Sequence, residues 1–124
     1  MITVGQVLTF LNTLAPPSMK MDWDNVGLLC GDKNTPVTKI LVALDPFYHV
    51  CREAEEIGAQ LIVTHHPIIF RPLTHLTAED ATSRGIMLLC AKGISAINAH
   101  TNLDQAPGGV NDALAAALGL QDVQ

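Results

Sequence analysis

Two short apolar runs separated by an amphipathic stretch most constrain the fold of this chain. Residues 40–44 read ILVAL and residues 61–64 read LIVT, and each run has the length of a β-strand. Apolar residues between them recur at the spacing of a buried helix face, which consists of Phe47, Val50, Cys51, Ala54 and Ile57. This order predicts a right-handed β-α-β unit, with residues 40–44 buried on both faces as in a parallel sheet.

The other segments extend this pattern along the chain. Residues 4–14 have helical spacing with Thr3 as N-cap, and residues 28–30 read as a strand. We expect a helix whose start is flanked by Thr77 and Asp80 and that runs to about Lys92 with Gly93 as its C-cap, a strand over 94–99 and a last helix over 110–118. The sequence therefore predicts an α/β fold, a sheet flanked by helices and built from β-α-β units, in a single domain over residues 1–124.

The composition restricts the class of partner. Lys and Arg number only seven, the formal net charge is −5, and no basic cluster is present. A protein that binds a phosphate backbone needs clustered positive charge, so we expect no direct nucleic-acid binding. Apolar residues make up 48% of the chain against 15% charged residues. This balance indicates either a well-filled core or an apolar surface that a partner covers.

The cysteines indicate the compartment. Cys30, Cys51 and Cys90 form no C-x-x-C pair, which excludes a thiolate zinc ribbon. Each lies in an apolar or amphipathic segment, so we expect buried structural thiols. The sequence shows no secretion signal, and no segment approaches the roughly 18 apolar residues of a membrane span. We therefore predict a reducing, cytoplasmic location without membrane contact.

Two adjacent histidines at the end of the second apolar run are the strongest functional signal. His65 and His66 follow Thr64 and precede Pro67, which keeps His66 extended and prevents a helix from starting through it. Neutral imidazole is the commonest metal ligand of proteins. Neighbouring side chains of a regular strand point to opposite faces. Only at the end of a strand can both imidazole rings face one pocket. There they can bind two metal ions, or one ion and its bound water.

A second polar group follows the next predicted strand. The segment AHTNLD at 99–104 places His100 and Asp104 directly after the apolar run 94–98. Because ligands bind beyond the carboxyl ends of parallel strands, we expect both residues to meet His65 and His66 at one edge of the sheet. A carboxylate beside imidazoles suits Zn, Fe or Mn, and an aspartate can bridge two ions.

Simpler roles exist for some of these residues. His100 alone fits a hydrogen-bonded residue at the sheet edge, and Asp104 alone fits the turn that follows it. Asp45 ends a predicted strand, where a catalytic carboxylate can sit. Asp45-Pro46 also fits an N-cap followed by proline at the first helical position, and we favour this structural role.

With these segments placed, the chain resembles the NIF-three-like family, also called GTP cyclohydrolase 1 type 2 homologues. The resemblance spans essentially all 124 residues and rests on WDNVGL at 23–28, ALD at 43–45, THHPIIF at 64–70, AHTNLD at 99–104 and GGVNDALAAALGL at 108–120. It implies an α/β protein with a dinuclear metal centre in a ring-shaped homo-oligomer, commonly a hexamer. His65, His66 and Asp104 match the family's metal ligands, and His100 matches a residue that lines the site.

The resemblance also implies a missing part. Family members are about twice this length or more, and their second half supplies a His and a Glu, spaced H-x-x-x-E, to the same two metals. These 124 residues correspond to the first half. We therefore expect a fragment, or a short homologue that completes its site across an interface.

These residues together predict a metal-dependent hydrolase, GTP cyclohydrolase 1 type 2-like, acting on a nucleotide or a related heterocycle. His65, His66 and Asp104 would hold up to two divalent ions that lower the pKa of a bound water toward about 7. His100 would orient this water or shuttle a proton. The alternative is a non-catalytic metal-binding regulatory or scaffold protein. A mononuclear iron oxygenase ranks last, because its usual H-x-D spacing is absent.

Overall fold

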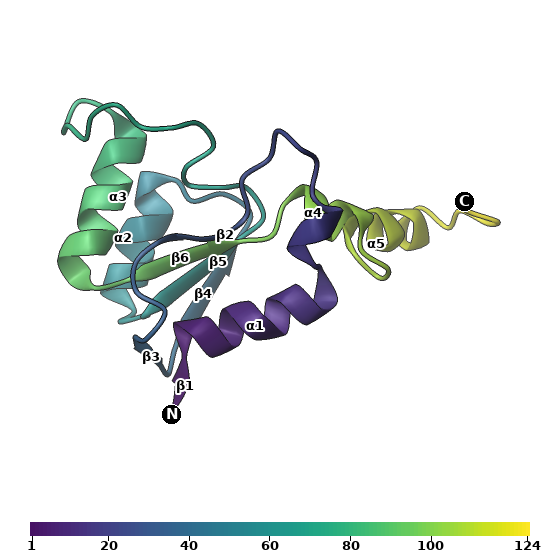
Figure 1. Cartoon of the computed structure of the whole chain (residues 1–124), viewed down its shortest axis with the longest axis horizontal. Helices are drawn as coiled ribbons and strands as arrows, with labels where there is room; N and C mark the ends of the chain where they lie inside the picture. The colour runs from purple at the N-terminus through teal and green to yellow at the C-terminus, as the bar shows by residue number, and fades with distance from the viewer.

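Six strands, five α-helices and one 3-10 turn make up the chain, in a computed structural model that describes residues 1–124 (Figure 1). In chain order they are β1 (Ile2–Thr3), α1 (Val4–Leu14), η1 (Pro17–Met19), β2 (Gly27–Cys30), β3 (Pro36–Val37), β4 (Ile40–Ala43), α2 (Tyr48–Glu56), β5 (Leu61–Thr64), α3 (Ala81–Lys92), β6 (Ser95–Asn98), α4 (Thr101–Gln105) and α5 (Val110–Ala117).

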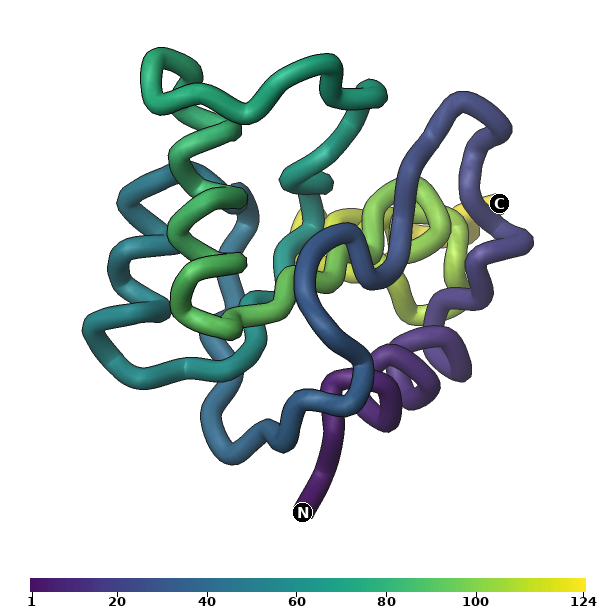
Figure 2. Tube along the Cα trace, turned by 60° about the vertical axis from the view of Figure 1, so that its left-hand side comes forward, coloured from purple at the N-terminus to yellow at the C-terminus, as the bar shows by residue number.

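Four strands form the central sheet in the order β2-β6-β5-β4. β4, β5 and β6 run parallel, whereas β2 joins β6 antiparallel and β1 pairs with β3 in a separate ladder. α2 and α3 pack side by side on one face of the sheet, and α1 covers the other face (Figures 1 and 2). The connections β4-α2-β5 and β5-α3-β6 are β-α-β units, so the predicted α/β fold is confirmed.

The core has two layers because neighbouring strand residues point to opposite faces of the sheet. In β5, Ile62 belongs to the apolar cluster on the α3 side with Leu89, and Leu61 belongs to the cluster on the α1 side with Val4. All four side chains are fully buried. Each such burial contributes about 1.5–3 kcal/mol. β5 is therefore held from both sides, and this anchoring fixes the point where His65 leaves the sheet.

Two helices begin where the sequence predicts. Thr3 caps α1 by accepting the Gln6 N–H at 3.3 Å, while Gln6 Oε1 accepts the Thr3 N–H at 2.9 Å. Asp80 caps α3 by accepting the Ser83 N–H at 2.7 Å. Gly93 ends α3 with a left-handed φ of 65°. These bonds are local, which is why the sequence reveals them.

The expectation that residues 40–44 are buried on both faces is wrong. β4 is an edge strand, and Val42 and Leu44 on its α1 side are 75% and 61% exposed. A helix is roughly 10 Å across and strands lie about 4.8 Å apart. α1 therefore covers only about half of the four-stranded sheet, and the edge strand remains open on this face.

The start of α2 also differs from the prediction. The helix begins at Tyr48 with Phe47 as N-cap and without a side-chain capping bond, so neither Asp45 nor Pro46 takes the predicted position. The middle of the predicted buried face is confirmed, but its two ends are wrong. Phe47 and Ile57 flank the helix and are exposed, at 59% and 38%. The Asp45 carboxylate bonds His66 instead of a backbone N–H of the helix.

One of the three cysteines departs from its predicted environment. Cys30 and Cys51 are buried as expected, whereas Cys90 is exposed. Cys90 follows Leu89, which is buried against the sheet. One residue further along a helix is about 100° further around it, so Cys90 lies at the edge of the core, where its Sγ is 3.6 Å from that of Cys30.

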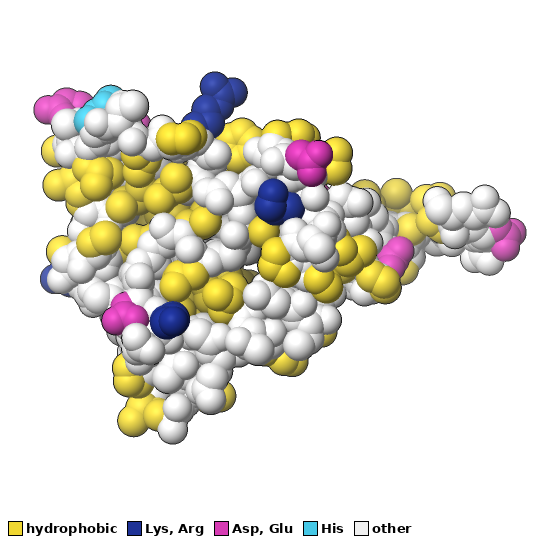
Figure 3. Space-filling view, in the orientation of Figure 1, with side chains coloured by type: hydrophobic (Ala, Val, Ile, Leu, Met, Phe, Trp, Pro, Cys, Tyr) yellow, Lys and Arg dark blue, Asp and Glu magenta, His cyan; other side chains and the backbone are white.

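Helix α5 projects from the body toward the C-terminus (Figure 1). The predicted helix is present, but none of its residues is buried. Its apolar residues Leu114 and Leu118 are 56% and 66% exposed, and hydrophobic atoms are visible along this arm in Figure 3. None of the helices has both the length and the apolar character that crossing a membrane requires.

Candidate metal centre

The parallel pairing of β5 and β6 brings two distant polar segments to one edge of the sheet. Thr64 at the end of β5 pairs with Asn98 at the end of β6. His65 and His66 therefore leave the sheet beside His100, although 34 or more positions separate them in the chain. The imidazole centroids lie 5.2 Å apart for His65 and His66, 5.0 Å for His65 and His100, and 5.5 Å for His66 and His100.

Each histidine offers one ring nitrogen to a shared position. Ligating nitrogens of His65, His66 and His100 all lie within 4.8 Å of one another. Two ligands on opposite sides of one ion with bonds of about 2.1 Å are roughly 4.2 Å apart. Two ions in a dinuclear site are about 3.5–4 Å apart. The three rings therefore form a possible metal-binding cluster whose size suits one ion or two.

The orientation of His65 shows which nitrogen is free. Its Nδ1 lies 2.8 Å from the carbonyl oxygen of Ala99. A carbonyl can only accept a hydrogen bond, so Nδ1 carries the proton and donates it. In the neutral ring, Nε2 then presents a lone pair. This Nε2 lies 3.4 Å from Asp104 Oδ1, which is also an acceptor. A proton or a cation between them removes the repulsion of the two electron pairs.

His66 is oriented by Asp45. Asp45 Oδ1 lies 2.5 Å from His66 Nδ1, so an ionised Asp45 accepts the Nδ1 proton and leaves Nε2 free. The backbone at this point is held as well, because the His66 N–H donates to the Leu44 carbonyl at 3.0 Å and Thr64 Oγ1 donates to the His66 carbonyl at 2.7 Å. The structural role that we favoured for Asp45, a helix cap, is thus wrong. Its carboxylate positions an imidazole.

His100 is oriented by Asp24. Asp24 Oδ1 lies 2.9 Å from His100 Nδ1, and the Asp24 side chain is completely buried. Burial raises the pKa of Asp24, but hydrogen bonds from Thr101, His100 and Asn25 outweigh it and lower the pKa to about 2. Thr101 contributes its N–H at 3.0 Å and its hydroxyl at 2.5 Å. Asp24 is therefore ionised at neutral pH and accepts the Nδ1 proton of His100.

Asp104 stands slightly apart from the three rings. It lies in α4, a short helix that the sequence did not predict, and its N–H donates to the His100 carbonyl at 3.0 Å. Two ligands about 2.1 Å from one tetrahedral ion are roughly 3.4 Å apart, and the separation of Asp104 Oδ1 from His65 Nε2 is 3.4 Å. The structure thus brings all four predicted residues together, and their roles as ligands stay predictions.

Sequence reasoning missed the two carboxylates that orient the rings. Asp24 lies in the segment WDNVGL, which carries the family resemblance but has no periodicity or spacing that points to a histidine partner. Asp45 was weighed for its position at a strand end, and a local explanation was preferred. Each aspartate lies far along the chain from the histidine that it orients. Asp24 and His100 are 76 residues apart, and Asp45 and His66 are 21 residues apart.

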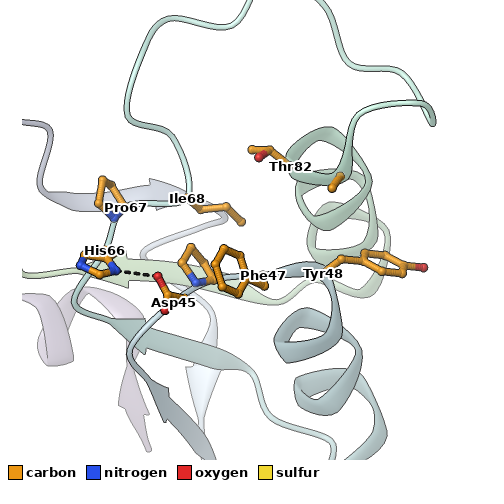
Figure 4. A pocket seen from close by; sticks show the side chains of 9 residues that line it. Asp45, Phe47, Tyr48, His66, Pro67, Ile68 and Thr82 are labelled. Atoms are coloured by element: carbon orange, nitrogen blue, oxygen red, sulfur yellow. Dashed lines mark hydrogen bonds and ion pairs between the residues drawn. The ribbon is translucent and has the colours of Figure 1, made fainter.

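A recess opens beside His66, and neither His65 nor His100 lines it. Its volume is about 230 Å³, and its walls include Asp45, Phe47, His66 and Thr82 (Figure 4). Figure 4 shows the bond between Asp45 and His66 at one end of the recess and the Thr82 side chain on the helix across from it. A small molecule that contacts His66 therefore has room for a second group in this recess.

The sequence profile described as Duf34/NIF3 (NGG1p interacting factor 3) matches residues 2–124. This chain belongs to the Duf34/NIF3 family. The resemblance drawn from its segments is therefore confirmed. A curated relative from Clostridium perfringens (strain 13 / Type A), named GTP cyclohydrolase 1 type 2 homolog, is 41% identical over 116 residues, which cover 94% of this chain and 44% of the relative.

Solved structures of Duf34/NIF3 relatives share the fold. A Bacillus cereus protein described as related to NIF3 matches with a TM-score of 0.92 and 39% identity, over 98% of this chain and 34% of that chain. Reduced HcgD from Methanocaldococcus jannaschii matches with a TM-score of 0.91 and 32% identity, over 98% of this chain and 49% of that chain. The chain thus spans less than half the length of these relatives.

Proposed function

We propose that this chain provides half of the active site of a metal-dependent hydrolase, GTP cyclohydrolase 1 type 2-like, with a dinuclear centre and a nucleotide substrate. One observation carries the proposal. Three imidazoles converge with each Nδ1 beside an oxygen that accepts its proton, one nitrogen of each ring lies within 4.8 Å of the others, and the Asp104 carboxylate lies 3.4 Å from His65 Nε2. Such a group of electron pairs is stabilised by a cation. The name of the Clostridium perfringens relative supports the choice of reaction.

In this proposal His65, His66 and Asp104 hold up to two divalent ions. Imidazole nitrogens with a carboxylate oxygen suit Zn, Fe or Mn. A bound ion supplies Lewis acidity, which makes a water molecule a better nucleophile at neutral pH. Two ions need more ligands than these three residues, so the remainder come from a second half-domain or a second chain. The partial coverage of the relatives is consistent with this requirement.

His100 acts on the proton of the attacking water in this scheme. Asp24 holds the Nδ1 proton of His100, which leaves Nε2 as the atom that orients the water and accepts its proton. The recess beside His66 receives the part of the nucleotide that does not react. Phe47 offers an aromatic surface there, and Thr82 offers a hydroxyl.

Metal content tests the site directly. Mass spectrometric metal analysis is made on protein purified without chelators, on His66→Ala and on the matched control His49→Ala, whose histidine is exposed on α2. We expect about one or two ions per chain in wild type and in the control, and loss of metal in His66→Ala. Metal-free wild type, or equal metal in all three proteins, refutes the site.

Turnover tests the reaction. Wild type and Asp104→Ala are compared on a panel of nucleotides and phosphoesters with added Zn²⁺, Fe²⁺ or Mn²⁺. Hydrolysis that depends on metal and on Asp104 supports the hydrolase. The panel is then repeated with a longer family chain, because a half-site binds metal without completing the reaction.

The second candidate is a metal-binding regulatory or scaffold protein. It is favoured by an apolar groove of about 250 Å³ between α1 and β4 that reaches His65 and includes Val42 and Leu44. An exposed apolar groove of this kind fits a protein partner. Full metal loading without turnover of any panel member by either chain length would support this candidate over the hydrolase.

A homohexameric ring and a cytoplasmic location complete the proposal. Exposed leucines on α5 and the open face of β4 support assembly through apolar surfaces. Three free cysteines fit a reducing compartment. In analytical ultracentrifugation, a molecular mass of six chains would support the ring. A mass of one chain at micromolar concentration would contradict the ring for this length of chain.

A further inference from the structure

Two cysteines that are distant in sequence meet on the α3 side of the sheet. Cys30 ends β2 and Cys90 lies near the end of α3, and their Sγ atoms are 3.6 Å apart. Both thiols are free. A disulfide has an S–S length of about 2.05 Å, so the sulfur atoms need to approach by roughly 1.5 Å. Rotation of an exposed side chain near a helix end can supply such a movement.

The two thiols have different environments. Cys30 is 8% exposed within the apolar cluster of α2 and α3, whereas Cys90 is exposed. Burial, the hydrogen bond with Cys90 and the neighbouring Cys90 and Cys51 sulfurs raise the pKa of Cys30 to about 12. Because Cys30 is buried, Cys90 is the thiol of this pair that a dissolved oxidant reaches. The third thiol, Cys51, is fully buried.

We propose that Cys30 and Cys90 form a reversible disulfide when the protein meets a peroxide. The Cys90 sulfur attacks one peroxide oxygen, the O–O bond breaks, and Cys90 becomes a sulfenic acid while its thiol proton and the departing hydroxide leave as water. The Cys30 sulfur then attacks the Cys90 sulfur. The S–O bond breaks as the S–S bond forms, and the Cys30 proton leaves with the hydroxyl group as water. Two thiols are oxidised, and one peroxide is reduced.

The geometry favours this reaction over further oxidation. A sulfenic acid without a neighbouring thiol proceeds to sulfinic acid with more peroxide. Here the second thiol already lies in contact, so condensation is intramolecular. The bond joins β2 to α3 and links positions 60 apart in the chain, closing a loop that contains the His65-His66 pair. A dithiol reductant reverses it by thiol–disulfide exchange.

The test treats the wild-type chain with a small excess of hydrogen peroxide and counts thiols after unfolding. We expect the count to fall from three to one, the intact mass to fall by about 2 Da, and dithiothreitol to reverse both changes. Proteolysis should join the peptide of Cys30 to that of Cys90. Cys51→Ala should lose two thiols as wild type does, and Cys90→Ser should form no bond.

Three results would overturn the proposal. The first is a sulfinic or sulfonic acid at Cys90 with Cys30 still free. The second is an intramolecular bond to Cys51, and the third is disulfide-linked dimers as the only product. Because Cys90 is exposed, Cys90→Ser should fold normally, and its circular dichroism spectrum should match that of wild type.

Discussion

Replacing the buried Asp24 by asparagine tests the carboxylate network beneath the candidate site. The pKa of Asp24 falls from 3.8 to about 2 on folding, because hydrogen bonds from Thr101, His100 and Asn25 outweigh the effect of burial. A difference of this size corresponds to about 2.4 kcal/mol in favour of the ionised form. Asparagine keeps the shape of the side chain but has no charge. It also turns an N–H₂ group toward donors that need an acceptor.

The sign of the pH dependence follows from the lowered pKa. The contribution of Asp24 to stability is complete above the unfolded pKa of 3.8 and is lost as the pH falls through about 2. We therefore expect the free energy of unfolding of Asp24→Asn to be lower than that of wild type by about 2.4 kcal/mol at pH 7. This difference should shrink steadily below about pH 4.

The assay is urea unfolding of chelator-treated protein at pH 7, 4 and 2.5, so that bound metal does not contribute. Asp22→Asn is the matched control, because Asp22 is exposed two positions away. We expect the control to change stability by less than about 0.5 kcal/mol. A deficit in Asp24→Asn below about 1 kcal/mol at pH 7, or one that is equal at pH 7 and 2.5, would refute the reasoning.

Four further predictions concern the site and the scaffold. Asp45→Ala should weaken zinc binding by about 10–100-fold, because His66 loses the partner of its Nδ1 proton; unchanged affinity in calorimetry would contradict this. Leu89→Ala should lower the free energy of unfolding in urea by about 2–5 kcal/mol, because Leu89 is fully buried. Thr3→Ala should lower the free energy of unfolding by about 1 kcal/mol, because it removes the cap of α1. The control Thr82→Ala, which replaces an exposed threonine, should lower it by less. Removal of metal by a chelator should lower the thermal midpoint, and added Zn²⁺ should restore it in wild type but not in His66→Ala.

The elements that sequence reasoning predicted well depend on nearby residues. The Thr3 capping box and the left-handed Gly93 are each decided within one helical turn. The apolar run at 61–64 became a strand buried on both sides because it lies in the middle of the sheet. A similar run at 40–44 became an edge strand. The two runs look alike in sequence, so only the strand order separates them.

The candidate site divides in the same way. The histidine doublet, His100 and Asp104 were predictable, because each directly follows an apolar run and the ends of parallel strands meet. Asp24 and Asp45 as ring-orienting groups were not, because each bond joins side chains from separate segments. For Asp45, a local capping rule predicted one partner, and the folded chain supplies another, His66.

Sequence alone determined the α/β class, the helix boundaries with strong caps and the four polar residues at the edge of the sheet, because periodicity, capping and strand-end chemistry are short-range properties. The tertiary structure decided which apolar run forms the edge, which nitrogen of each histidine is free and which cysteine meets Cys30. These outcomes depend on distances between residues that are far apart in the chain. Packing of the complete sheet sets those distances, and no local pattern encodes them.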